Sequence, residues 1–180
     1  MALSNAEVAS RYGQALFDVA ESKDITSQTA AELAELQKVI EEQPDLLVFF
    51  ASPQITNEAK KEMLQSLQSN ASQLVNDFLQ MLFDYGRLQN VSDIIDEFNR
   101  LNDDKNGTVR VRVTTAIKLD DEQKAKISAK FAQVVGANKV VLEPVVDEKI
   151  IGGVVLRSQD NIYDGSVKSK IDKIKRLLLN

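Results

Sequence analysis

The spacing of the apolar residues changes once along this chain, and that change limits what the chain can fold into. Up to about residue 105, apolar side chains recur every three or four residues, which is the period of an amphipathic helix. Over residues 108–115 the pattern alternates, with Val109, Val111 and Val113 separated by polar side chains, as in a half-buried strand. The sequence therefore predicts an α+β protein with a helical first part and a mixed second part.

The helical part divides into six segments at residues that stop or start helices. Pro44 and Pro53 interrupt the apolar pattern, Thr56 can cap the helix that follows, and Gly86 suits the left-handed position beyond a helix end. We expect an N-terminal six-helix bundle with helices over residues 5–22, 27–42, 45–51, 56–68, 71–85 and 88–103.

The second part predicts a small α/β C-terminal domain. Asp120 and Gln123 form a capping box that opens a helix ending near Gly136, and a final helix is expected over 167–178. A tight hairpin at Asp147-Glu148-Lys149 is expected to join the last two of three strands, over 108–115, 140–146 and 150–156. The polar stretch 102–107 marks the boundary between two predicted domains, 1–105 and 106–180.

The two predicted domains differ in charge. Residues 1–105 carry 8 Lys and Arg against 18 Asp and Glu, a net charge of −10, whereas residues 106–180 carry 14 against 9, a net charge of +5. A sign change between two halves favours domains that meet different partners.

The composition argues against an enzyme. The chain has no His and no Cys, which removes the usual general base, the thiol nucleophile and the common metal ligands. Gly152-Gly153 is a poor candidate for a phosphate loop, because no Gly-Lys-Ser/Thr follows and no helix begins there. We expect no catalytic residues, no metal and no cofactor.

We also expect no signal peptide and no direct membrane insertion, since the densest apolar run, 46–51, is far shorter than the ~20 residues that span a bilayer.

The first and fifth helices carry more apolar surface than one core contact needs. Each has apolar residues over roughly 200° of its circumference at about 100° per residue. One interpretation is that both helices are buried on two sides. The other is that one series packs in the core while the second, which includes a Tyr on each helix, binds a partner helix. The expected partner-binding residues are Val8, Tyr12, Ala15, Val19, Leu74, Phe78, Met81 and Tyr85.

The last helix is strongly basic. Five Lys and Arg residues surround a narrow apolar stripe of Val167, Ile171, Ile174 and Leu178. The pattern fits a solvated face on a packed helix, and it also leaves open binding to nucleic acid or to an acidic membrane surface.

Several motifs resemble the delta subunits of bacterial F-type ATP synthases along nearly the whole chain. Residues 10–17, Ser-Arg-Tyr-Gly-Gln-Ala-Leu-Phe, look like the opening helix of that family, and 85–88, Tyr-Gly-Arg-Leu, like its turn from the fifth to the sixth helix. Residues 146–153, followed by Asp-Gly-Ser-Val at 164–167, look like its C-terminal signature. The chain departs from the family pattern at Glu148 and at Ser158-Gln159-Asp160, both in expected turns.

The resemblance implies a non-catalytic stator subunit that connects the catalytic head to the peripheral stalk and resists torque during ATP synthesis. It implies that residues 1–105 bind the N-terminal helix of an alpha subunit between the first and fifth helices. It also implies that residues 106–180 contact the C-terminal ends of the b subunits, and that the protein lies peripherally at the cytoplasmic face of the cell membrane. The same family includes the mitochondrial oligomycin sensitivity-conferring protein.

Two rival functions remain to be tested. An RNA-binding bundle is disfavoured by the −10 charge of the first part, because phosphate binding needs a basic face; we expect no nucleic acid partner. A carboxylate-dependent enzyme would show turnover or a stoichiometric metal.

Overall fold

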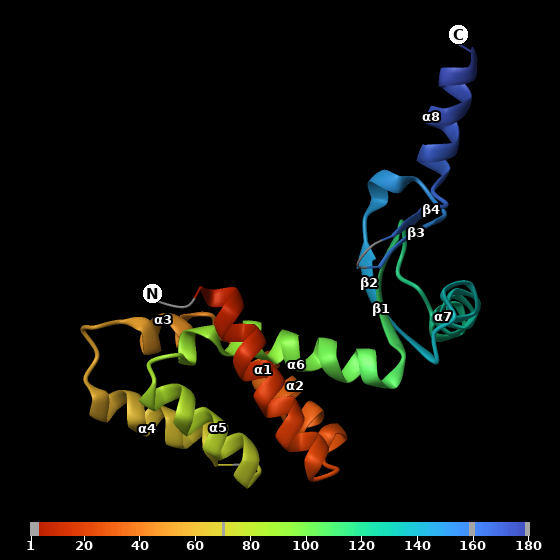
Figure 1. Cartoon of the computed structure of the whole chain (residues 1–180). Helices are drawn as coiled ribbons and strands as arrows, with labels where there is room; N and C mark the ends of the chain where they lie inside the picture. The colour runs from red at the N-terminus through yellow and green to blue at the C-terminus, as the bar shows by residue number, and fades with distance from the viewer. Residues whose placement is uncertain (1–3, 70, 159–160, 179–180) are drawn as a thin grey trace. The chain divides into compact units, whose positions relative to one another are not determined.

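Two compact units make up the protein, Met1–Asn102 and Asp103–Asn180. The computed structural model describes residues 4–69, 71–158 and 161–178, with side chains up to residue 176 (Figure 1). The division falls three residues before the expected boundary, within the last helical turns of the first part. Gln159 and Asp160, two of the residues at which the chain departs from the family pattern, lie outside the described residues, as does the side chain of Leu178.

The N-terminal unit is built from the six expected helices. The observed elements are α1 (Asn5–Ser22), α2 (Thr26–Glu42), α3 (Asp45–Ala51), α4 (Asn57–Gln68), α5 (Gln73–Asp84), the short 3-10 helix η1 (Leu88–Asn90) and α6 (Val91–Asn106). The sixth helix therefore opens with a 3-10 turn. The predicted fold class, a helical bundle followed by a small α/β domain, is confirmed.

Local hydrogen bonds account for where these helices begin and end. Ser4 and Glu7 form a capping box at the start of α1, and the Thr56 side chain accepts a hydrogen bond from the Ala59 backbone at the start of α4. Gly86 has φ +63 and lets the backbone N–H of Arg87 reach back to the Leu82 carbonyl at 2.7 Å. This is the left-handed helix end that the sequence predicts.

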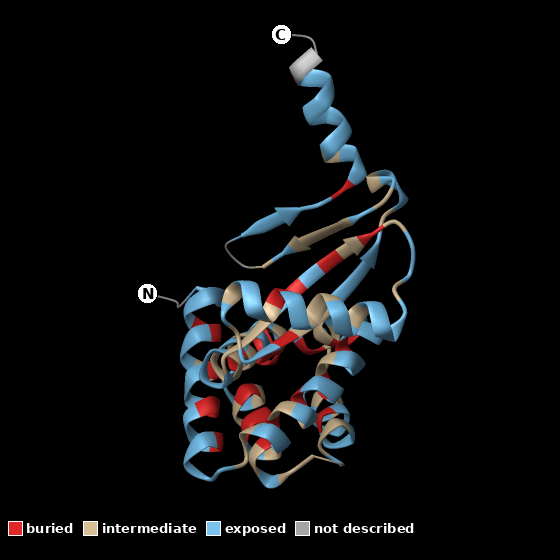
Figure 2. Ribbon diagram, turned by 90° about the vertical axis from the view of Figure 1, so that its right-hand side faces the viewer, coloured by how far each residue is buried: buried red, intermediate tan, exposed pale blue. Residues whose placement is uncertain are grey.

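The core of the N-terminal unit contains the inward stripes of its helices (Figure 2). Leu33, Leu64 and Ile94 are fully buried, and the rings of Phe17 and Phe98 meet edge to face with centroids 5.8 Å apart. Each helix thus contributes one apolar stripe to a single core, as amphipathic periodicity requires.

Gly13 explains how closely α1 approaches α6. A Cβ on Gly13 would lie 2.8 Å from both Cβ and Cγ of Glu97 and 3.1 Å from the Ile94 carbonyl oxygen. Only glycine leaves room for this helix contact without a shift of α6.

The C-terminal unit is a four-stranded sheet with helices. Its elements are β1 (Thr108–Thr115), α7 (Asp121–Val135), β2 (Lys139–Val146), the 3-10 helix η2 (Glu148–Ile150), β3 (Val154–Arg157), β4 (Ile162–Asp164) and α8 (Val167–Leu178). The strand order is β2-β1-β3-β4, with β1 parallel to β2 and antiparallel to β3. The capping box of Asp120 and Gln123 is present, and Gly136 ends α7 with φ +67.

The expected tight hairpin between the second and third strands is wrong. Strands β2 and β3 lie on opposite sides of β1, and residues 147–153 carry the chain across the end of that strand. The Asp147 N–H donates to the Thr115 carbonyl at 2.8 Å, at the point of crossing. The third strand is accordingly shorter than expected, and β4 was not expected at all.

One face of the sheet packs on α7. Val111 and Val113 are fully buried beside Phe131, whose ring meets Tyr163 of β4 edge to face at 5.3 Å. The alternation in β1 thus places its valines inward, as the sequence predicts.

Candidate partner-binding surfaces

Helix α1 separates its apolar residues into a core face and an outward face. The series Ala9, Gly13, Leu16, Phe17 and Ala20 is buried throughout, which confirms it as the core side. In the other series, Tyr12 is half-buried, Ala15 is exposed and Val19 is 39% exposed. These three residues leave an apolar strip that the described residues of the unit do not cover completely.

Val8 does not share this outward position. Its side chain is fully buried in the core of the unit, so the expectation that it faces outward is wrong. Helical periodicity gives the direction of a side chain around the axis but not which neighbours cover each turn along it. Here η1 and α2 pack against α1.

Helix α5 shows the same division. Val75, Leu79 and Leu82 are buried, Leu74 and Met81 are half-buried, and Tyr85 is 69% exposed just beyond the last turn. Phe78, expected to face outward, is 4% exposed and belongs to the core. Among the residues of α5 that were expected to face outward, Phe78 lies closest to the core face. It is roughly 40° from Leu82 around the helix axis, and its long ring reaches inward.

The outward residues of α1 and α5 belong to helices that share two neighbours. Both helices pack against α2 and against η1. The two helices predicted to bind a partner therefore pack against the same supporting elements. Val8 and Phe78 do not lie on the exposed surface of these helices.

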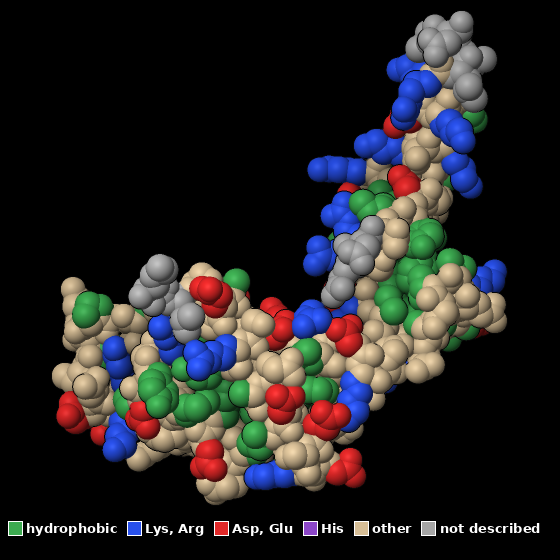
Figure 3. Space-filling view, in the orientation of Figure 1, with side chains coloured by type: hydrophobic (Ala, Val, Ile, Leu, Met, Phe, Trp, Pro, Cys, Tyr) green, Lys and Arg blue, Asp and Glu red, His purple; other side chains and the backbone are tan. Residues whose placement is uncertain are grey.

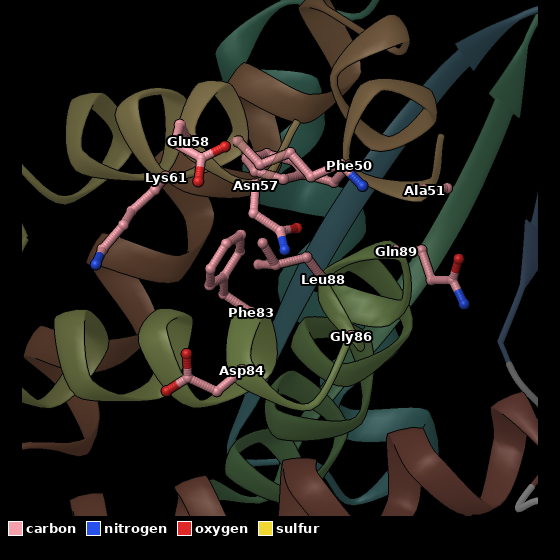
Figure 4. A pocket seen from close by; sticks show the side chains of 11 residues that line it. Phe50, Ala51, Asn57, Glu58, Lys61, Phe83, Asp84, Gly86, Leu88 and Gln89 are labelled. Atoms are coloured by element: carbon pink, nitrogen blue, oxygen red, sulfur yellow. The ribbon is translucent and has the colours of Figure 1, made fainter. Parts of the chain in front are cut away.

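Two hollows of the N-terminal unit border α5, and the outward residues of α5 line neither of them. The larger, about 740 Å³, lies where α3, α4 and the turn after α5 meet (Figure 4). Phe83 and Leu88 point into it, while Glu58, Lys61 and Asp84 extend around it. The smaller, about 480 Å³, lies between α2, α4 and α5. Neither hollow was expected from the sequence, because each is bounded by elements that meet only in the folded unit.

A long-range hydrogen bond holds the start of α5 beside α2. The Ser72 backbone N–H donates to Glu32 Oε2 at 2.9 Å, and Gln28 donates to the other carboxylate oxygen. Burial opposes ionisation of Glu32, but these hydrogen bonds outweigh it and hold its pKa below the ordinary glutamate value.

In the C-terminal unit, the two halves of the signature meet each other. Gly153 has φ +81, and a Cβ there would lie 2.4 Å from the Gly165 carbonyl oxygen. The Gly165 N–H donates to the Val154 carbonyl at 2.9 Å, and the Val167 N–H donates to the Gly152 carbonyl at 3.0 Å. This cluster, residues 152–154 with 165–167, is called the α8 anchor below.

The α8 anchor also caps the last helix. The buried Ser166 side chain accepts from the Ser169 N–H at 3.1 Å, and Asp164 accepts from the Ser166 N–H at 2.9 Å. The hydrogen bonds from Ser166 lower the pKa of Asp164. The glycines of the signature therefore have a structural role, because they allow the backbones of residues 152–154 and 165–167 to approach closely.

The described residues contain neither a candidate metal-holding cluster nor a candidate membrane-spanning helix. Within residues 4–69, 71–158 and 161–178, no group of three His, Cys, Asp or Glu side chains could hold a metal ion. In the same residues, no helix has the length and apolar character that crossing a membrane requires.

Comparison with known proteins decides the family. The sequence profile of the ATP synthase delta (OSCP) subunit family matches residues 8–178. The chain belongs to the ATP synthase delta subunit family. It is similar to ATP synthase subunit delta of Ligilactobacillus salivarius, with 50% identity over 99% of both chains, and to that of Lactiplantibacillus plantarum, with 41% identity over 100% of this chain and 99% of the other.

A solved structure supports the fold of this delta-family chain. A chain in the cryo-EM structure of the Toxoplasma gondii mitochondrial ATP synthase hexamer aligns with a TM-score of 0.73 and 21% identity, over 96% of this chain and 97% of that one. As a delta-family member, the protein is a non-catalytic structural subunit of the F-type ATP synthase and part of the stator that links the catalytic head to the peripheral stalk.

Proposed function

We propose that the N-terminal unit binds the N-terminal helix of an alpha subunit along the outward faces of α1 and α5. The contact residues are Tyr12, Ala15, Val19, Leu74, Met81 and Tyr85. Exposed and half-buried apolar side chains on two helices with common neighbours suit a partner helix that lies along them. Ala15 adds a small side chain that permits close approach, and the Tyr residues place a polar tip at the rim.

The C-terminal unit binds the C-terminal ends of the b subunits in this proposal. Its net charge has the opposite sign to that of the first part, which favours a different partner. The protein then lies at the cytoplasmic face of the cell membrane and is held there through the complex.

The proposed mechanism is mechanical. Rotation inside the head produces a counter-torque on the alpha/beta ring, and the ring turns with the rotor unless it is held. A connector bound at both ends transmits that load from the ring to the stalk. It needs tight contacts and no chemistry of its own, which agrees with a chain that lacks His and Cys.

The proposal rests on the split of α1 into a buried series and a partly exposed apolar strip of Tyr12, Ala15 and Val19. The test is isothermal calorimetry of the full chain with a synthetic alpha N-terminal peptide and, separately, with a soluble b-subunit fragment. Binding of both at separate sites is expected, and displacement of one by the other would contradict it. ATP and a short RNA serve as controls that should show no heat of binding.

A further inference from the structure

Helix α8 has an exposed apolar stripe with the spacing of a coiled coil. Val167, Ile171 and Ile174 are 38%, 50% and 57% exposed. Their spacings of four and three residues match alternating d and a positions of a heptad, and the stripe covers only about 60° of the helix. A stripe this narrow is the seam of a two-helix contact rather than the broad face of a helix buried in a larger core.

The charged residues beside this seam, at the positions where charges decide pairing, are all basic. With Ile171 at a and Ile174 at d, Lys168 and Lys175 occupy e positions and Lys170 occupies a g position. All three are exposed, and none forms an ion pair with a described acidic side chain. Lys and Arg side chains extend along the helix in Figure 3.

The first turn of α8 is held by its own unit. The α8 anchor fixes the first turn through Gly152, Ser166 and Val167, and η2 packs beside it. From Lys170 to Arg176 every side chain is exposed. A 12-residue helix is marginally stable without packing, so a partner along the seam would complete it.

We propose that α8 pairs through this seam with an amphipathic helix of another subunit, one that has acidic residues beside its own apolar seam. Like charges at the e and g positions oppose pairing between two copies of α8 and favour a partner of opposite charge. A lipid surface fits less well, because the stripe is narrow and α8 has no aromatic residue. The inference rests on the proposed contact with the b subunits and assigns that contact to α8.

The test compares two double charge reversals in the full chain. Lys170→Glu with Lys175→Glu reverses both sides of the seam, whereas Lys173→Glu with Arg176→Glu makes the same change of net charge away from it. Binding to a soluble b-subunit fragment is measured by calorimetry at low and moderate salt, with circular dichroism as the folding control. The seam variant should lose about tenfold or more in affinity, and the control variant less than about threefold.

The outcomes separate the inference from the proposed function. If the unaltered chain does not bind the fragment at all, the proposed b contact fails. If it binds and both variants bind equally well, the contact exists but α8 does not make it, which overturns the inference. Self-association of the unaltered chain that Ile171→Asp abolishes would also overturn it, as would binding through α8 to phosphatidylglycerol vesicles but not to the fragment.

Discussion

Neighbouring residues on α1 should respond in opposite ways to the same charge. Ala15 is exposed on the outward face, while Leu16 is 4% exposed and belongs to the core. Asp at either position adds one carboxylate to the same turn of the same helix. The pair therefore separates the binding face from the folding face with one chemical change.

The magnitudes follow from burial. Leu16→Asp loses about 2 kcal/mol of apolar burial and adds several kcal/mol for an unpaired buried carboxyl group, so at least about 4 kcal/mol is expected. That is a large share of a typical stability of about 5–15 kcal/mol. Ala15→Asp costs the free chain only about 0.7 kcal/mol in helix propensity. In the complex it would place a charge in a desolvated contact and lower alpha-peptide affinity about 100-fold.

Thermal unfolding by circular dichroism and peptide calorimetry measure the two effects. The melting temperature of the N-terminal unit should fall by about 20 °C or more for Leu16→Asp and by only about 3–5 °C for Ala15→Asp. If Ala15→Asp unfolds the unit while Leu16→Asp spares it, the two faces of α1 are assigned the wrong way round. Normal peptide binding by a folded Ala15→Asp variant would place the alpha contact elsewhere.

Three further predictions concern stability. Gly153→Ala should destabilise the C-terminal unit by about 3 kcal/mol or more, against about 1 kcal/mol for Gly136→Ala, because both have positive φ but only Gly153 meets backbone atoms; equal urea midpoints would contradict this. Gly13→Ala should lower the melting temperature despite the better helix propensity of Ala, since α6 leaves no space; a rise would show that α6 shifts freely. Glu32→Gln should lower the free energy of unfolding by about 1 kcal/mol at pH 7 and by almost nothing near pH 3. The pKa of Glu32 is lower in the folded state than the unfolded value of about 4.3. Its contribution to stability is therefore present above the unfolded pKa and is lost as pH falls through the folded pKa. A pH-independent difference in urea titrations would exclude this role.

Local signals in the sequence were sufficient to predict where the helices of this protein lie. Caps and breakers such as Thr56 and Gly86 act within four or five residues, so their effect is written in adjacent positions. The same holds for the capping box at Asp120 and for the alternation of β1. The family motifs were also readable, and the comparisons confirmed the resemblance.

The order of the strands and the exposure of the apolar residues depend on how the elements pack in three dimensions. The pattern of β2 and β3 fits a hairpin, but the crossing of β1 depends on hydrogen bonds from distant residues, including the one from Asp147 to Thr115. Val8 and Phe78 belong by their spacing to the outward series, yet both are buried in the core of the unit. Periodicity records the direction of a side chain around its own helix. The exposure of that side chain depends on every element packed nearby, and that information is spread over the whole chain.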